Sequence, residues 1–105
     1  MSVSPSRILR NVPKEEAFYF FTSIGNYTGQ NAASLDELLL RIKDIDIKSL
    51  EFHLYRGDLE KWIALTLGDA KLAEEIKNLR DTKVVGNAVR DRLYFIVSRH
   101  LKRAR

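Results

Sequence analysis

One histidine has the neighbours that acid–base chemistry requires. His53 is followed closely by Arg56, Asp58 and Trp62. A carboxylate can orient a histidine ring so that its other nitrogen takes a proton from a bound substrate, as a general base must. His53, Arg56, Asp58 and Trp62 therefore form the first candidate site in the sequence.

The same residues also fit a purely structural role. His53 shares a predicted helix face with Leu50 and Leu54, which favours a partly buried ring that is hydrogen-bonded to a carboxylate such as Asp58. No Ser–His–Asp pattern is recognisable in the chain. We therefore predict a protein that is not an enzyme and holds no cofactor and no metal. A ligand-binding or enzymatic pocket around His53, Asp58 and Trp62 stays as an alternative, and it requires His53 to be exposed at the base of a concave pocket.

Positive charge is concentrated in the last segment of the chain. The whole sequence has a net charge of +4. Residues 85–105 contain one acid, Asp91, against six bases: Arg90, Arg92, Arg99, Lys102, Arg103 and Arg105. Basic side chains clustered on one helix attract phosphates, and binding is driven by the release of counterions. These six residues are candidate nucleic-acid contacts, and the alternative is a solvated helix face.

The segment after Pro13 fits two structures. A helix would place four apolar residues on one face, at Ala17, Phe20, Phe21 and Ile24. The run Phe18–Thr22 also has high strand propensity. Because no convincing partner strand follows it, we predict a helix. The next residues, 25–31, read as a loop, since Gly and Asn tolerate the backbone angles of tight turns.

Helix boundaries can be read from local signals in the rest of the chain. Ser34 and Glu37 have the spacing of a capping box. Gly57 and Gly68 are placed to end helices, and each is followed by an aspartate that can cap the next helix. The last helix is predicted to begin near Gly86. These signals predict an all-α fold, a compact single-domain bundle of about five to six short helices.

Length and composition agree with one small domain. We expect a flexible N-terminal arm over residues 1–12 and a single helical domain over residues 13–105, with a basic C-terminal helix. The chain has no cysteine, which excludes disulfides and zinc–thiolate sites. No stretch reaches the roughly 20 apolar residues that cross a membrane, and no signal peptide is recognisable. We therefore expect a cytoplasmic protein with no membrane partner.

Several short motifs resemble one family. The matching elements are Ala17-Phe18-Tyr19-Phe20, Ala33-Ser34-Leu35, Ser49-Leu50-Glu51-Phe52-His53, Arg56-Gly57-Asp58-Leu59 with Trp62, Leu67-Gly68-Asp69 and Leu72-Ala73. The region 18–73 resembles a domain of unknown function that is found in archaea and bacteria, alone or appended to larger enzymes. Relatives often have Phe at the position of Leu59. The resemblance implies a portable helical module and implies no activity.

Two functional hypotheses follow. The first is a non-catalytic helical interaction module that binds another protein, through an apolar patch that includes Tyr19, Tyr27 or Tyr55. The second is a nucleic-acid-associated protein that contacts phosphates through the six C-terminal bases. A homodimer through the apolar stripe of the last helix is a further alternative.

Overall fold

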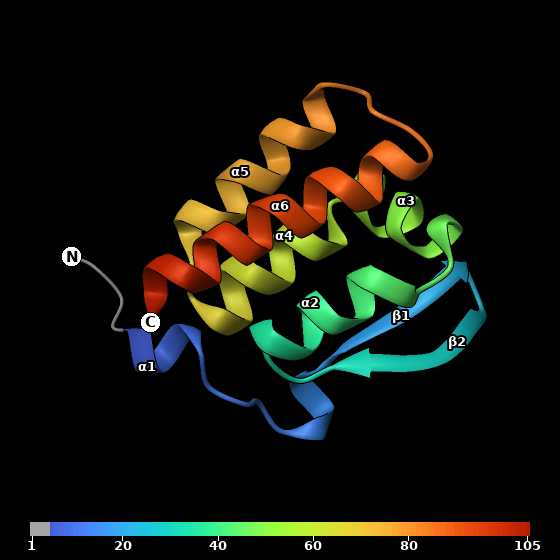
Figure 1. Cartoon of the computed structure of the whole chain (residues 1–105). Coiled ribbons are helices and arrows are strands. Elements are labelled where there is room, and N and C mark those ends of the chain that lie inside the picture. The colour runs from blue at the N-terminus through green and yellow to red at the C-terminus, as the bar shows by residue number, and fades with distance from the viewer. Residues whose placement is uncertain (1–4) are drawn as a thin grey trace.

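The computed structural model describes residues 5–105, with side chains from residue 7 onward. Its elements are α1 (Pro5–Ile8), the 3-10 turn η1 (Lys14–Glu16), β1 (Phe18–Ser23), β2 (Asn26–Ala32), α2 (Leu35–Asp44), α3 (Ile47–Arg56), α4 (Asp58–Trp62), the π-helical segment η2 (Ile63–Leu67), α5 (Ala70–Asp81) and α6 (Asn87–Ala104). The helix α6 packs against α2, α3 and α5. The hairpin of β1 and β2 lies along one side of this bundle, against α2 and α3 (Figure 1).

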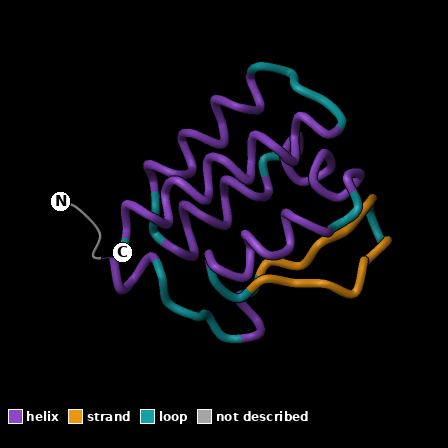
Figure 2. The backbone as a smooth tube through the Cα atoms, viewed as in Figure 1, coloured by secondary structure: helices purple, strands orange, loops and turns teal. Residues whose placement is uncertain are grey.

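The segment that we predicted as the first helix is instead the turn η1 and the strand β1, and residues 25–31, which we predicted as a loop, form the turn of a β-hairpin and most of β2. β1 and β2 pair antiparallel, with Phe18 opposite Ala32 and Phe21 opposite Tyr27. The all-α prediction is therefore wrong, and the fold combines helices with a two-stranded antiparallel sheet (Figure 2). The strand propensity of the aromatic run prevails because a partner strand does exist. Ile24, which we placed on an inward helix face, lies at the turn and is 82% exposed.

The two faces of the hairpin differ in character. Phe18 and Phe20 are buried in the core, whereas Tyr19 and Phe21 are half-buried on the opposite face. This alternation is the period of a strand. The pairing is irregular opposite Phe20, where β2 contains Gly29 with φ of +86°. This irregularity gives the β2 edge a bulge, which makes it a poor template for a further strand.

Most of the predicted helix boundaries are confirmed. Ser34 Oγ accepts a hydrogen bond from Glu37 N–H at 3.1 Å, and Gly57 ends α3 with φ of 78°. Asp69 caps α5 by accepting from Leu72 N–H at 3.1 Å. The prediction that Asp58 caps α4 is wrong, because Gly57 is the N-cap residue and no side chain caps that end. The Asp58 carboxylate binds other side chains, as described below.

The core lies between the helices and the inner face of the hairpin. Its fully buried side chains include Phe20, Leu38, Leu54 and Ile63. The apolar stripe of α6, formed by Val89, Leu93, Val97 and Leu101, is also buried in this core. The stripe that we considered as a dimer surface is therefore covered by the chain itself.

The end of the expected N-terminal arm packs against the domain. Residues 1–4 lie outside the described part of the chain. Val12 is buried, and its N–H donates to Ala33 O at 2.7 Å. Arg10 donates to Thr66 O at 2.6 Å. These contacts attach the last residues of the arm to the residue that follows β2 and to η2.

Candidate functional site

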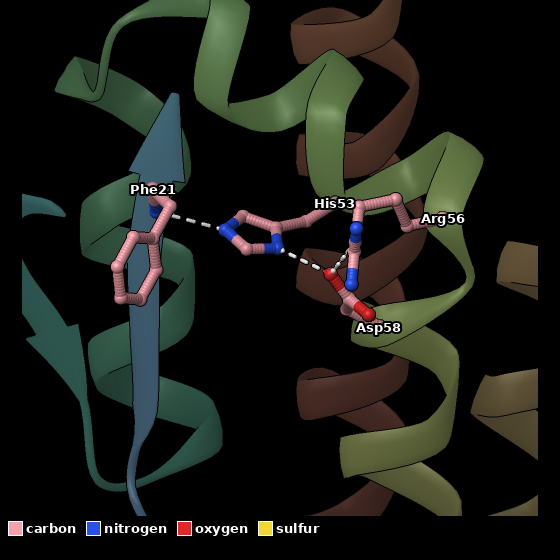
Figure 3. Close-up of polar contacts among 4 residues, drawn as sticks. All are labelled: Phe21, His53, Arg56 and Asp58. Carbon is pink, nitrogen blue, oxygen red and sulfur yellow. Dashed lines mark hydrogen bonds and ion pairs between the residues drawn. The ribbon is translucent and has the colours of Figure 1, made fainter. Parts of the chain in front are cut away.

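The candidate histidine joins β1 to the corner between α3 and α4. His53 Nε2 accepts a hydrogen bond from the Phe21 backbone N–H at 2.8 Å, and His53 Nδ1 lies 2.9 Å from Asp58 Oδ2 (Figure 3). Arg56 Nε donates to the same carboxylate oxygen at 3.0 Å. We call this group of His53, Asp58, Arg56 and the Phe21 amide the histidine clasp. It unites three residues of the predicted site around a strand that the prediction had missed.

The hydrogen bonds of the clasp fix the protonation of the imidazole ring. A backbone N–H can only donate, so Nε2 must be the unprotonated nitrogen. The ring proton is therefore on Nδ1 and is donated to Asp58. Both ring nitrogens are occupied within the chain, and His53 is only 5% exposed. The alternative of an exposed general base at the bottom of a pocket is therefore not the arrangement in this structure.

Burial also lowers the pKa of His53 from its usual value near 6.5. The main cause is the loss of water around the ring, which disfavours the charged form. The carboxylate of Asp58 opposes this effect by hydrogen bonding and by charge, while Arg56 adds to it. Protonation would also place a second N–H donor against the Phe21 amide. The clasp therefore requires a neutral histidine.

Acidification is expected to destabilise the domain through His53. Because the pKa of His53 is lower in the folded state, the unfolded chain takes up more protons as the pH falls below about 6.5, and the free energy of unfolding decreases. Urea unfolding of the wild type at about pH 7.5 and about pH 5.5 measures this loss. The variant His53→Gln has no titrating group there and should lose less stability over the same interval. Equal losses in the two proteins would contradict the prediction.

Trp62, the fourth residue of the predicted site, holds the turn before β1. Its Nε1–H donates to Glu16 O at 2.8 Å, in the turn that precedes the strand. Its ring packs edge-on against Phe18, with 5.7 Å between the ring centroids. His53 and Trp62 therefore attach β1 and the turn before it to the helices at two points.

A cleft lies beside the clasp, between β1 and α3. Its volume is about 360 Å³. We call it the β1–α3 cleft, and its lining consists of Ala17, Phe18, Tyr19, Phe21, Ser23, Ile24, Gly25, Phe52, His53, Arg56 and Asp58. The walls are mostly apolar, and the charged groups are Arg56 and Asp58. A space of this size accepts one or two side chains or a small ligand.

The outer face of the hairpin continues the apolar surface of this cleft. Tyr27 packs against Tyr19 and Phe21, with ring centroids 5.8 Å and 5.3 Å apart. Tyr27 is 46% exposed, and Ile24 extends the surface at the turn. We call Tyr19, Phe21, Ile24 and Tyr27 the hairpin face. Tyr55, which we had also considered for an apolar patch, donates its hydroxyl to Val84 O instead.

Comparison with known protein families identifies the chain. Residues 13–105 match the model of DUF5752, described as a family of unknown function. The chain belongs to this family. No curated protein and no solved structure matches it. The resemblance to an uncharacterised domain family is therefore confirmed, and membership in the DUF5752 family supplies no activity. The site of this DUF5752 domain must be interpreted from its own geometry.

The six basic residues near the end of this DUF5752 domain have different surroundings. Arg90 points into the structure, where its two terminal nitrogens donate to Ile42 O and Ile45 O, each at 2.7 Å. These two carbonyls lie in the last turn and at the C-cap of α2, where a cation is favourable. Arg90 therefore has a structural role at the end of α2.

Two more of the six bases are paired with acids. Arg99 Nη2 lies 3.2 Å from Glu75 Oε1, and Arg105 pairs with Asp36. Three bases remain exposed without such a pairing in the described residues: Arg92, Lys102 and Arg103. The phosphate-binding surface that we considered is thus reduced to half of its expected bases.

The described residues contain neither a metal-binding cluster nor a membrane-spanning helix. No group of three or more His, Cys, Asp or Glu residues is arranged to hold a metal ion. No helix within the described part of the DUF5752 domain is long and apolar enough to cross a membrane.

Sequence reasoning missed the residues that shape the surface beside the clasp. Phe21 and Phe52 line the cleft, and their role depends on the hairpin that we read as a helix. The alternation of buried and outward aromatic residues from Phe18 to Phe21 was the available signal. The role of the Phe21 amide had no signal, because every residue except proline carries the same backbone N–H.

Proposed function

We propose that this domain is a non-catalytic protein-interaction module that binds its partner on the hairpin face. The observation that supports this proposal best is the cluster of Tyr19, Phe21 and Tyr27 on the solvent side of a hairpin. Contiguous exposed apolar surface is costly in water unless a partner covers it. Tyrosine and phenylalanine are also enriched at the centres of protein interfaces.

The rigidity of the hairpin supports the proposal. A two-stranded hairpin by itself is only marginally stable in water. Here the Phe21 amide is held by His53, and Glu16 O is held by Trp62. A surface that is already ordered loses little conformational entropy when it binds a partner, so more of the contact energy appears as affinity.

The chemistry of the clasp supports a non-catalytic role. A general base needs a free lone pair that faces the substrate. The lone pair of His53 Nε2 is used by Phe21 N–H, and Asp58 Oδ2 is shared by His53 and Arg56. The clasp therefore acts as a structural tie beneath the binding surface.

A protein partner is favoured over a nucleic acid because of where the bases lie. Arg90 donates to two backbone carbonyls, and Arg99 and Arg105 are each paired with a carboxylate, which lowers the net positive charge that the last helix offers to phosphates. The hairpin face offers aromatic rings, and the cleft next to it holds a single base, Arg56. Nucleic-acid sites combine stacking rings with several phosphate contacts.

Site-specific photocrosslinking in cells tests this function. A photoreactive phenylalanine analogue is placed at Tyr27, and protein adducts are identified by mass spectrometry. We expect one dominant adduct, because the ring at this position lies within the interface. With the purified partner, Tyr27→Ala should weaken binding by about 30-fold, the effect of a residue at the centre of an interface.

The matched control places the same analogue at Leu65, an exposed apolar position in η2. It should give no adduct with that partner, and Leu65→Ala should leave the affinity unchanged. Adducts of equal yield at the two positions, or none at Tyr27, would contradict the proposal. Nucleic-acid adducts at Tyr27 would replace it with the alternative.

A further inference from the structure

The strand edge beside α3 determines how a partner can bind in the β1–α3 cleft. A peptide that extends a sheet must accept and donate hydrogen bonds along the free edge of a strand. On this edge, His53 Nε2 already accepts from the Phe21 N–H in place of a neighbouring strand (Figure 3). A partner segment cannot pair with β1 at this residue unless the clasp opens. It must therefore be recognised by its side chains.

Arg56 is the group in the cleft that is best placed to recognise a charged side chain. Its Nε is fixed by Asp58 Oδ2, and its guanidinium carbon lies 5.0 Å from the centre of the Phe52 ring. Within the described residues, the guanidinium is ion-paired with Asp58 through Nε, and its two terminal nitrogens donate no hydrogen bond. The side chain is 49% exposed. Two parallel N–H donors in this position match the two oxygens of a carboxylate.

The charges around the cleft also favour an acidic partner. The carboxylate of Asp58 is already bound by His53 and by Arg56. Lys48 is exposed on α3, and the spacing of Lys48, Phe52 and Arg56 at i, i+4 and i+8 places them along one side of the helix. Arg56 therefore lies over the ring of Phe52, and Lys48 lies one helical turn before Phe52 on the same side of α3. A carboxylate approaching this side of α3 meets positive charge next to apolar surface.

We infer that the partner presents a peptide segment in which an Asp or Glu side chain binds the terminal nitrogens of Arg56 and a neighbouring aromatic or aliphatic side chain fills the β1–α3 cleft. The inference rests on the proposed function, since the cleft and the hairpin face share Tyr19, Phe21 and Ile24. It adds the chemistry of the partner and the residue that reads it. A cleft of about 360 Å³ has room for such an apolar side chain.

Selection from a displayed library of random peptides, each fused at its carboxyl end, tests the inference without knowledge of the partner. The fusion removes free terminal carboxylates, so acidic recognition must come from side chains. We expect the selected peptides to share an Asp or Glu next to Phe, Leu, Ile or Trp. The affinity of a selected peptide should fall by about tenfold for Arg56→Gln, the typical loss for a charge-assisted contact. Replacing its acid with the matching amide should weaken binding to the same extent.

Combining the two changes tests direct contact. The amide peptide should bind the wild type and Arg56→Gln with equal affinity, because the contact is already lost. Arg92→Gln is the matched control, since Arg92 is an exposed arginine on α6, and it should leave binding unchanged. The thermal midpoint of Arg56→Gln is measured beside that of the wild type. Arg56→Lys keeps the positive charge but not the two parallel N–H donors of the guanidinium, so it should restore only part of the affinity.

The outcomes separate this inference from the proposed function. Binding that depends on Tyr27 but not on Arg56 would overturn the inference and leave the proposed function standing. Peptides with no acidic residue in common, binding that depends on Arg92, or a library without binders to the wild type would also overturn it. Peptide binding that depends on neither Arg56 nor Tyr27 would overturn both the inference and the proposed function.

Discussion

Replacing His53 with alanine is expected to lower the free energy of unfolding by roughly 2 to 4 kcal/mol. The substitution leaves the Phe21 N–H without its acceptor and vacates the space of a buried ring. That ring lies edge-on to Phe18 and Phe52, with centroids 4.8 Å and 5.0 Å away, so its removal also leaves aromatic neighbours without contacts. Urea unfolding followed by circular dichroism measures the loss.

Two milder variants divide this effect between the two sides of the ring. The amide nitrogen introduced by His53→Asn can replace Nδ1 as a donor to Asp58, and the amide oxygen introduced by His53→Gln can replace Nε2 as an acceptor for Phe21. We expect His53→Gln to be the more stable of the two by about 1 kcal/mol. Among the described residues, His53 is the acceptor of the Phe21 N–H, whereas Asp58 is partly exposed and keeps Arg56. A more stable His53→Asn would show that the tie to Asp58 matters more than the tie to β1.

The helix boundaries could be predicted because their chemistry is local. Ser34 and Glu37 lie one helical turn apart, and a capping box needs only that spacing. Gly57 and Gly68 end helices in left-handed conformations that favour glycine. Such signals depend on a few neighbouring residues and do not require knowledge of the tertiary fold.

The hairpin could not be predicted in the same way, because it depends on a strand without a clear pattern. β2 contains Asn26, Gly29 and Asn31, all of which have low strand propensity or favour turns. It pairs because β1 offers an adjacent edge and Gly29 permits the bulge. The aromatic run of β1 could thus be read as an amphipathic helix as long as its partner strand was taken for a loop.

The candidate site was predictable in part for the same reason. His53 and Asp58 stand on the two sides of Gly57, so their contact follows from the turn between two helices. The prediction that Asp58 caps α4 failed because the His53 ring and Arg56 compete for its carboxylate. The acceptor role of His53 toward Phe21 requires β1 to be a strand, and it was therefore beyond local reasoning.

Replacing Trp62 with alanine is expected to lower the free energy of unfolding by roughly 3 to 5 kcal/mol, the range for a buried tryptophan. Trp62 is buried, packs against Phe18 and donates to Glu16 O. The matched control Trp62→Phe keeps an aromatic ring and removes the donor, so it should cost only about 1 to 2 kcal/mol. Urea unfolding at neutral pH measures both variants. A loss in Trp62→Phe as large as that in Trp62→Ala would mean that the hydrogen bond, and not the packing, dominates.

The two ties of β1 should not act independently. If the hairpin detaches from the helices as one unit, a variant that weakens its contact at Phe21 reduces the free energy of unfolding that a second variant, at the contact with Glu16, can remove. The double variant His53→Asn with Trp62→Phe should therefore lose less free energy of unfolding than the sum of the losses in the two single variants, by at least about 0.5 kcal/mol.

Amide hydrogen exchange in β1 and β2 should accelerate in each single variant, while exchange at Leu93 in α6 should follow only the global stability. Additive losses would mean that the two contacts open separately, and the hairpin face would then lack the common support that the proposed binding surface requires.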